Sequence, residues 1–478
     1  MRSFLELTHA WGPVNRLTML SNLAPSASKS TLPVTPLTRK GLASWLSRQP
    51  AKLQRWVKST HFGANEGELC LVPGSDGSLG RALIGVAALD DAWSYSILPA
   101  RLPKGRYRLD PEPEAAQANA AALGFALGTY RFGRYKKQEV AYAHLVWPEA
   151  VDKPLISALV EGIGLCRDLI NTPADDLGPP ELCEEGQNLA KRHGGKARIL
   201  RGDKQLIEGF PSVYAVGRAA SKPPHLLDFT WGDEAHPKVT LVGKGVIFDS
   251  GGLDLKPAAS MKLMKKDMGG AALVLGVAHV VMSLGLPIRL RVLVPAVENC
   301  IGPNAMRPLD VLKTRKGITV EVGNTDAEGR LILSDALTAA DEEKPALLID
   351  AATLTGAARV ALGTALPALF CNHDGTADEI LAAGLAAKDP LWRLPLHQPY
   401  AKLLESPVAD INNVTNDTYA GAITAALFLE RFVSPSTPWA HIDTMAWNVD
   451  TKPGRPVGGE AFALRALVEM LSRRYPPR

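Results

Sequence analysis

The sequence predicts an α/β protein with a smaller N-terminal α/β domain and a larger C-terminal domain whose mostly parallel sheet is flanked by helices. Three observations predict this class. The chain has 478 residues, which is more than a single hydrophobic core usually serves. Its composition, 46% hydrophobic and 21% charged, is that of an ordinary globular protein. From Pro180 onward, apolar runs alternate with helical patterns, as expected for a sheet covered by helices on both faces.

Domain boundaries follow from a long helical pattern that ends in a proline-rich loop. Pro173, Pro179 and Pro180 come directly after this pattern, and such a loop is typical of a connector between domains. The first residues contain several serines and no clean leader pattern, so we expect a flexible tail there. The predicted parts are a tail at 1–30, an N-terminal α/β domain at 31–150, a connecting helix at 151–172 and a C-terminal domain at 173–478.

The N-terminal domain shows mixed helical and strand patterns and no group of residues that indicates chemistry. Its short strands are bounded by Gly, Pro or Asp, which commonly end strands. The predicted elements are a helix at 37–59, strands at 68–72, 82–86 and 94–98, a helix at 111–130 and a strand at 140–146.

The C-terminal domain begins with a predicted helix at 181–193 and then alternates strands with helices. Strands are expected at 197–200, 225–231, 239–242, 288–295, 317–322 and 346–350, and helices at 270–284 and 331–337. In open sheets of this kind, the working crevice lies at the carboxyl ends of the strands. Polar residues at those ends are therefore the first candidates for a site.

Charge and composition exclude several classes of protein. The net charge of +4 is small for this length, and no dense basic block indicates a nucleic-acid binder. Five scattered cysteines without CxxC spacing predict reduced thiols and a cytoplasmic location. The ten histidines form no HExxH pair, which argues against a zinc site built from histidines. No apolar run is long enough to cross a membrane.

One octapeptide, Asn324–Leu331, places two carboxylates and a guanidinium between a predicted strand and a predicted helix. Loops at such junctions commonly hold functional side chains on a rigid scaffold. Acidic residues are also common helix caps in solvated turns, so the octapeptide alone leaves both interpretations open. We expect it to lie at the carboxyl end of a strand in the main sheet.

A second cluster of charged residues follows the predicted strand at 239–242. Lys244, Asp249, Lys256 and Asp267 lie in glycine-rich turns that allow close backbone approach. Two observations argue against a phosphate loop: the Walker pattern is absent, and carboxylates repel phosphate. A buried ion-pair network is one alternative. The other is a pair of divalent cations, which neutralise clustered carboxylates and bind their oxygens as ligands.

These motifs together resemble the leucyl aminopeptidase family (M17) of two-metal exopeptidases. The resemblance rests on the octapeptide, on Gly243–Pro257 and Lys266–Ala272, and on two later segments, Asp350–Ala357 and Pro438–Asp443. It covers roughly Arg167 to the C-terminus. It implies that residues 173–478 form a catalytic metallopeptidase domain that removes N-terminal residues, with a leucine-like preference, by a two-metal mechanism with a bridging water.

The resemblance also implies roles for individual residues. The metal ligands would be Lys244, Asp249, Asp267, Asp326 and Glu328, holding two Mn²⁺ or Zn²⁺ ions per subunit. Lys256 and Arg330 would be the catalytic pair: the lysine polarises the scissile carbonyl, and the arginine holds a bicarbonate that acts as the base. The substrate cleft would be bordered by Lys256, Met264, Asp267, Thr353, Leu354 and Gly356.

The resemblance implies partners as well: peptide substrates and a homohexamer, with no membrane. Some relatives also bind DNA, although the near-neutral charge makes nucleic acid a weak prediction here. A metal-dependent phosphoesterase is the alternative enzyme, because all-oxygen ligand clusters also suit Mg²⁺. Release of phosphate instead of an amino acid from test substrates would favour it.

Overall fold

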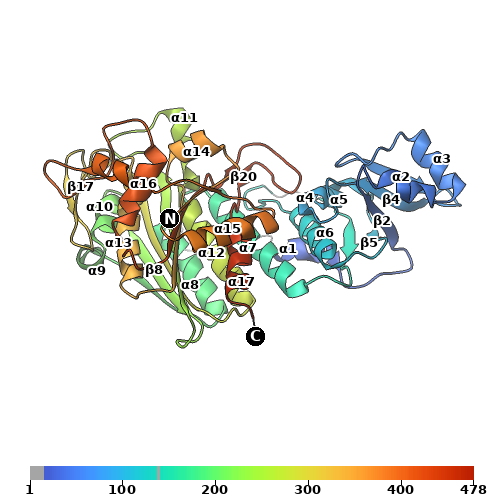
Figure 1. Ribbon diagram of the computed structural model, residues 1–478, viewed down its shortest axis with the longest axis horizontal. Coiled ribbons are helices and arrows are strands. Elements are labelled where there is room, and N and C mark those ends of the chain that lie inside the picture. The colour runs from blue at the N-terminus through green and yellow to red at the C-terminus, as the bar shows by residue number, and fades with distance from the viewer. Residues whose placement is uncertain (1–15, 137–139, 478) are drawn as a thin grey trace, which may run out of the picture. The chain divides into compact units, whose positions relative to one another are not determined.

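The computed structural model describes residues 16–136 and 140–477, and they fall into two compact units (Figure 1). The first unit runs to Gly164 and includes the short segment Asp450–Pro456. The second unit contains Leu165–Val449 and Val457–Arg478. The division falls within helix α7 (Lys153–Asn171), inside the segment predicted as a connecting helix.

The first unit contains a six-stranded sheet in the order β1-β6-β5-β2-β4-β3. All neighbouring strands in it are parallel except β3 and β4. The strands are β1 (Leu23–Ala24), β2 (Leu32–Leu37), β3 (Leu69–Pro73), β4 (Leu79–Gly85), β5 (Arg106–Leu109) and β6 (His144–Val146). The helices are α1 (Arg16–Ser21), α2 (Leu42–Ser47), α3 (Ala51–Ser59), α4 (Ala92–Tyr95), α5 (Leu98–Arg101) and α6 (Ala115–Leu127).

Three predictions in this unit need correction. The helix expected at 37–59 is two helices, α2 and α3. Pro50 has no N–H to continue α2, and it lies at the N-cap of α3. The run 94–98, expected as a strand, belongs to helices α4 and α5. There the Asp91 carboxylate accepts a hydrogen bond from the Ser94 N–H at 3.1 Å and caps α4. Residues 16–24, expected in the flexible tail, form α1 and β1, and residues 1–15 lie outside the described part of the chain.

The second unit contains a nine-stranded sheet in the order β16-β15-β18-β14-β9-β11-β8-β7, with β10 paired to β11. The central strands β18, β14, β9 and β11 are parallel, whereas β8, β7 and β15 join in antiparallel orientation. The sheet is therefore mixed, with the predicted parallel order at its centre. Its strands are β7 (Lys196–Arg201), β8 (His225–Trp231), β9 (Lys238–Gly243), β10 (Gly245–Asp249), β11 (Arg289–Asn299), β14 (Leu347–Ala352), β15 (Ala368–Cys371), β16 (Trp392–Arg393) and β18 (Trp439–Asp443).

Helices cover both faces of this sheet. Val242 packs in one core cluster with Leu331 and Ile332 of α13 (Glu328–Asp341). The next residue, Gly243, lies so close to α12 (Gly269–Ser283) that a Cβ there would come within 2.6 Å of Ala271. Because successive strand residues point to opposite faces, α12 and α13 lie on opposite sides, as Figure 1 shows.

The remaining helices of the second unit are mostly short. They are α8 (Pro179–Arg192), α9 (Asp203–Gly209), α10 (Pro211–Gly217), α11 (Ala258–Met261), the 3₁₀ helix η1 (Met264–Met268), α14 (Gly356–Leu362), α15 (Asp374–Ala386), η2 (Gln398–Leu404), α16 (Gly421–Glu430) and α17 (Leu464–Arg474). Two small sheets complete the unit: β12 (Val311–Lys313) with β13 (Thr319–Glu321) and β17 (Ile411–Asn412), and β19 (Trp447–Asn448) with β20 (Gly458–Gly459). Among the described residues, no helix is both long and apolar enough to span a membrane.

Candidate metal centre

The first half of the site lies at the carboxyl ends of β9 and β10. Lys244 follows β9, and its backbone is held on both sides: its N–H donates to the Ala351 carbonyl at 3.0 Å, and its carbonyl accepts from the Ala271 N–H at 2.9 Å. Asp249 is the last residue of β10. Asp267 lies in η1, directly before α12, and all three side chains are buried. The expected placement at strand ends is therefore correct for Lys244 and Asp249, whereas Asp267 lies in a 3₁₀ helix.

Close packing beside Asp267 depends on the glycines of the Lys266–Ala272 motif. A Cβ on Gly270 would lie 2.0 Å from the carbonyl oxygen of Ala351 in β14. Only glycine allows α12 to begin this close to the sheet. The start of α12 is thereby fixed, and Asp267 is held at the edge of the sheet.

The second half of the site is the octapeptide, and its position corrects a prediction. It follows β13, which belongs to the three-stranded sheet with β12 and β17 and not to the main sheet. Helix α13, which starts at Glu328, carries it to the site by packing on the main sheet. A Cβ on Gly329 would come within 2.5 Å of the Lys244 side chain, so this glycine lets the helix approach that lysine.

Asn299 joins the two halves. It is the last residue of β11 and is 2% exposed. Its Nδ2 donates to Asp249 Oδ1 at 2.9 Å and to the Thr325 carbonyl at 3.1 Å. Sequence analysis missed this residue, although its position at the end of a long apolar strand was an available signal. The Thr325 hydroxyl adds a second link by donating to the Gly251 carbonyl at 2.6 Å.

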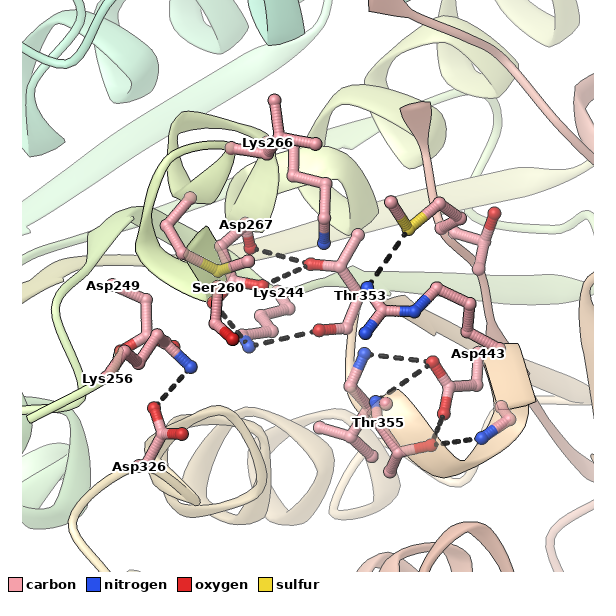
Figure 2. Close-up of a pocket in the computed structure, with 18 of the residues that line it drawn as sticks. Lys244, Asp249, Lys256, Ser260, Lys266, Asp267, Asp326, Thr353, Thr355 and Asp443 are labelled. Atoms are coloured by element: carbon pink, nitrogen blue, oxygen red, sulfur yellow. Dashed lines mark hydrogen bonds and ion pairs between the residues drawn. The ribbon is translucent and has the colours of Figure 1, made fainter. Parts of the chain in front are cut away.

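The five predicted metal ligands converge. Lys244 Nζ lies 2.6 Å from Asp267 Oδ2 and 3.0 Å from Glu328 Oε1. One carboxylate oxygen from each of Asp249, Asp326 and Glu328 lies within 4.8 Å of the others. Figure 2 shows Lys256 between Asp249 and Asp326; its Nζ is 2.8 Å from Asp249 Oδ2 and also pairs with Asp326.

The electrostatics of this cluster are dominated by an excess of negative charge. Burial and the neighbouring charge of Asp249 raise the pKa of Asp326 to about 6. The same two causes raise the pKa of Glu328 well above its usual value. Burial alone would lower the pKa of Lys244, but the nearby carboxylates of Asp267 and Glu328 outweigh it and raise that pKa. Burial would raise the pKa of Asp267 as well, but the charge of Lys244 outweighs burial and lowers that pKa. The raised pKa values of Asp326 and Glu328 show that positive charge is in short supply around these two acids.

This donor set fits divalent cations. Four carboxylates share two lysines, and their oxygens converge from two separate segments. Hard oxygen ligands at this density are the partners that divalent ions prefer. A cation between them would supply the missing positive charge, and it would reverse the rise in the carboxylate pKa values. The buried ion-pair network considered from the sequence corresponds to this cluster without metal. In that state the two lysines do not balance the charge of the four carboxylates.

Arg330 does not line the cavity of about 470 Å³ that opens next to the carboxylate cluster. It is 8% exposed, and its Nη1 donates to the Asn413 carbonyl at 2.6 Å. Its guanidinium carbon is 6.0 Å from the centroid of the Phe428 ring. Burial lowers the pKa of Arg330 to about 10. Most predicted site residues thus line the cavity, whereas Arg330 is buried and does not line it.

A cavity of about 470 Å³ opens next to the carboxylates (Figure 2). Apolar side chains and the loop at the start of α14 also line this cavity. Predicted site residues that line it are Lys244, Asp249, Lys256, Met264, Asp267, Asp326, Thr353, Leu354 and Gly356. Glu328 does not line the cavity, and its carboxylate pairs with Lys244.

Asp443, which was not assigned a role from the sequence, shapes this wall. Its Oδ1 accepts from the N–H groups of Leu354 and Thr355 at 2.9 and 3.2 Å, and its Oδ2 accepts from the Thr355 hydroxyl at 2.6 Å. The Thr353 hydroxyl donates to Asp267 Oδ1 at 2.7 Å. The loop from Thr353 to Gly356 is therefore tied both to β18 and to the metal-binding half of the site.

An α/β unit with a carboxylate cluster at the edge of its sheet, beside a cavity, defines the class of metal-dependent hydrolases. Comparison with protein families gives the particular group. Residues 164–468 match the model for the cytosol aminopeptidase family, catalytic domain, and residues 32–148 match that for the M17 aminopeptidase, N-terminal domain. The chain belongs to the cytosol aminopeptidase family, and it is a peptidase of that family.

Individual relatives agree with this assignment. The chain is 42% identical over 378 residues to a probable cytosol aminopeptidase of Roseiflexus castenholzii, covering 75% of this chain and 77% of the relative. A crystal structure of cytosol aminopeptidase from Coxiella burnetii has 48% identity and a TM-score of 0.91, over 95% of this chain and 100% of that one. The bottromycin maturation enzyme BotP in complex with Mn has 34% identity and a TM-score of 0.82, over 93% and 99%.

Proposed function

We propose that the chain is an aminopeptidase that removes the N-terminal residue of peptides with two divalent metal ions and a water molecule between them. The carboxylate cluster that opens into the cavity carries this proposal, because such a cluster suits two ions next to a bound substrate. Mn²⁺ or Zn²⁺ are the proposed ions, and a complex with Mn of the similar enzyme BotP supports the former.

The proposed roles follow from where each side chain lies. Lys244, Asp249, Asp267, Asp326 and Glu328 would hold the ions. Bound ions of this kind lower the pKa of a water molecule and polarise a carbonyl group. The side chain of Lys256 is 12% exposed, at the cavity wall, so its ammonium is a donor for the oxygen of the scissile carbonyl. Arg330, buried behind the wall, would bind a small anion such as bicarbonate that accepts a proton from the water.

A leucine-like preference is supported by the apolar part of the cavity. Leu263, Met264, Leu366 and Met445 line it together with Ala358. Burying a leucine side chain against such walls stabilises a complex by about 1.5–3 kcal/mol. The family also favours the peptidase over the phosphoesterase alternative, because its members are named as peptidases. The homohexamer, the cytoplasmic location and DNA binding stay predictions.

Removal of metal is expected to inactivate the enzyme. Treatment with a chelator should lower kcat/KM for leucine amide by at least about a hundred-fold, because the attacking water would lose its activation and several kcal/mol of transition-state stabilisation would be lost. Adding back Mn²⁺ or Zn²⁺ should restore activity, with two ions per chain by elemental analysis. Full activity in a preparation free of metal would contradict the metal assignment.

Replacing Lys256 by Ala is expected to lower kcat for leucine amide by about 10²–10³, which is the effect of losing one donor to the oxyanion. The matched control is Lys262→Ala, which removes an exposed lysine that does not line the cavity. Metal content should be measured in both variants. Normal turnover in Lys256→Ala, with metal retained, would show that this lysine does not act on the carbonyl.

A further inference from the structure

Lys266 is a buried lysine whose charge the proposed chemistry does not use. It lies in η1 directly before Asp267, is 5% exposed and lines the cavity. Figure 2 shows its nitrogen at the inner end of the side chain, near Thr353, and no dashed line reaches it. Within residues 16–136 and 140–477, no carboxylate lies within ion-pair distance of this nitrogen. A buried ammonium group in this state is unfavourable until an anion joins it.

The other charges of the cavity are already paired. Asp267 pairs with Lys244, and both Asp249 and Asp326 pair with Lys256. Asp443 is engaged by the loop before α14, through two N–H groups and a hydroxyl. The acids that line the cavity thus have partners that are closer than Lys266.

A second cation lines the same cavity. Arg359 of α14 lines the cavity and is exposed, and its Nη1 contacts the Met445 sulfur at 3.7 Å. In the described part of the chain, it has no carboxylate partner either. Apolar side chains line the same cavity, among them Leu263, Met264 and Met445.

We propose that Lys266, assisted by Arg359, binds a carboxylate of the substrate, so that the enzyme accepts peptides whose N-terminal residue is glutamate or aspartate beside leucine-like ones. This inference rests on the proposed aminopeptidase function. The amine and the scissile carbonyl lie at the carboxylate cluster, and the first side chain extends into the rest of the cavity. The methylene groups of glutamate then contact the apolar wall, and its carboxylate reaches the lysine, forming a charge-assisted hydrogen bond.

The test compares aminoacyl amides that differ in one group, using the full chain loaded with Mn²⁺. Glutamate and glutamine amides have the same shape and differ in charge, so their ratio of kcat/KM reports the carboxylate contact. The wild-type enzyme is expected to favour glutamate over glutamine by at least about ten-fold, since a charge-assisted hydrogen bond exceeds a neutral one. Lys266→Met should lower this ratio by at least about thirty-fold, because it leaves the carboxylate buried without its partner.

Two control variants sharpen the result. Lys262→Met makes the same change at an exposed lysine outside the cavity, and the glutamate-to-glutamine ratio should stay at its wild-type value. Lys266→Arg keeps the charge and should retain most of the preference. If Lys266→Met does not fold, inhibition of the wild-type enzyme by free glutamate and by free glutamine replaces it, with glutamate expected to bind at least about ten-fold more tightly.

The outcomes separate the inference from the function on which it rests. Failure to hydrolyse every amide would overturn the aminopeptidase proposal itself. Hydrolysis of leucine and glutamine amides, with no preference for glutamate and no change in the ratio in Lys266→Met, would overturn only the inference. The carboxylate could also be the C-terminus of a dipeptide. In that case Lys266→Met would impair leucyl-glycine but not leucyl-glycinamide, and the assignment to an acidic first residue would be wrong.

Discussion

Replacing Glu328 by Ala is expected to lower kcat/KM for leucine amide by at least about a thousand-fold. Glu328 is 1% exposed, and it faces Asp249 and Asp326 across the proposed ion site. Its loss removes one of the two carboxylate ligands that the octapeptide would supply. Several kcal/mol of transition-state stabilisation are therefore lost. Asp326→Asn should have a similar effect, because it removes a negative charge with almost no change in shape.

The control for both variants is Glu342→Ala. Glu342 follows the same helix α13 at its C-terminal end, where its exposed carboxylate pairs with Arg315. Activity should stay at the wild-type level, since this residue is far along the helix from the cavity. Circular dichroism and thermal unfolding establish that each variant is folded. Wild-type turnover in folded Glu328→Ala would contradict the assignment of the metal ligands.

Replacing Glu460 by Ala is expected to destabilise the second unit by about 3–5 kcal/mol. Glu460 accepts from Arg167 through both carboxylate oxygens, with Nη2 at 3.0 Å from each and Nε at 3.1 Å from Oε1. The side chain of Arg167 is fully buried, and that of Glu460 is 6% exposed. The variant deprives a buried guanidinium of its carboxylate, which costs far more than losing a surface pair.

Glu469→Ala is the matched control for this stability prediction. Glu469 pairs with Arg473 one turn along α17, and both side chains are exposed to solvent. An exposed pair of this kind is worth about 0.3–0.5 kcal/mol. Denaturant unfolding of the two variants should therefore give free energies that differ by several kcal/mol. Equal free energies would show that the Arg167–Glu460 pair does not hold α7 to the C-terminal segment.

Much of the second unit was predictable because local pattern and tertiary structure agree there. The strands β8, β9, β11 and β14 are mostly apolar runs. Helix α12 begins with a glycine pair that permits close packing on the sheet. In the first unit, local pattern located β3, β4 and α6 but missed β2 and β5. Strand β2 contains Pro33 and Pro36, and prolines in a run argue against a strand assignment. Strand β5 is only four residues long.

The residues of the site could be predicted from the sequence, but the elements that bring them together could not. The octapeptide was expected at an end of the main sheet, because its strand precedes a helix as the others do. In the structure its strand is part of a small separate sheet, and α13 brings the acidic residues to the cluster. Pairing partners of short strands depend on distant segments, here β17 at Ile411–Asn412. A single sequence does not contain that information in local form.

The sequence by itself determined which residue types this protein has for its chemistry: acids and lysines in glycine-rich turns, which suit divalent cations or a buried ion-pair network. Tertiary structure alone decided which of them meet. It placed Asn299 between the two halves, buried Arg330 behind the cavity wall, and aimed Lys266 into the cavity without a carboxylate partner among the described residues. The physical reason is that charge and side-chain chemistry are local properties of a sequence, whereas burial and the distance between charges arise only when remote segments pack together.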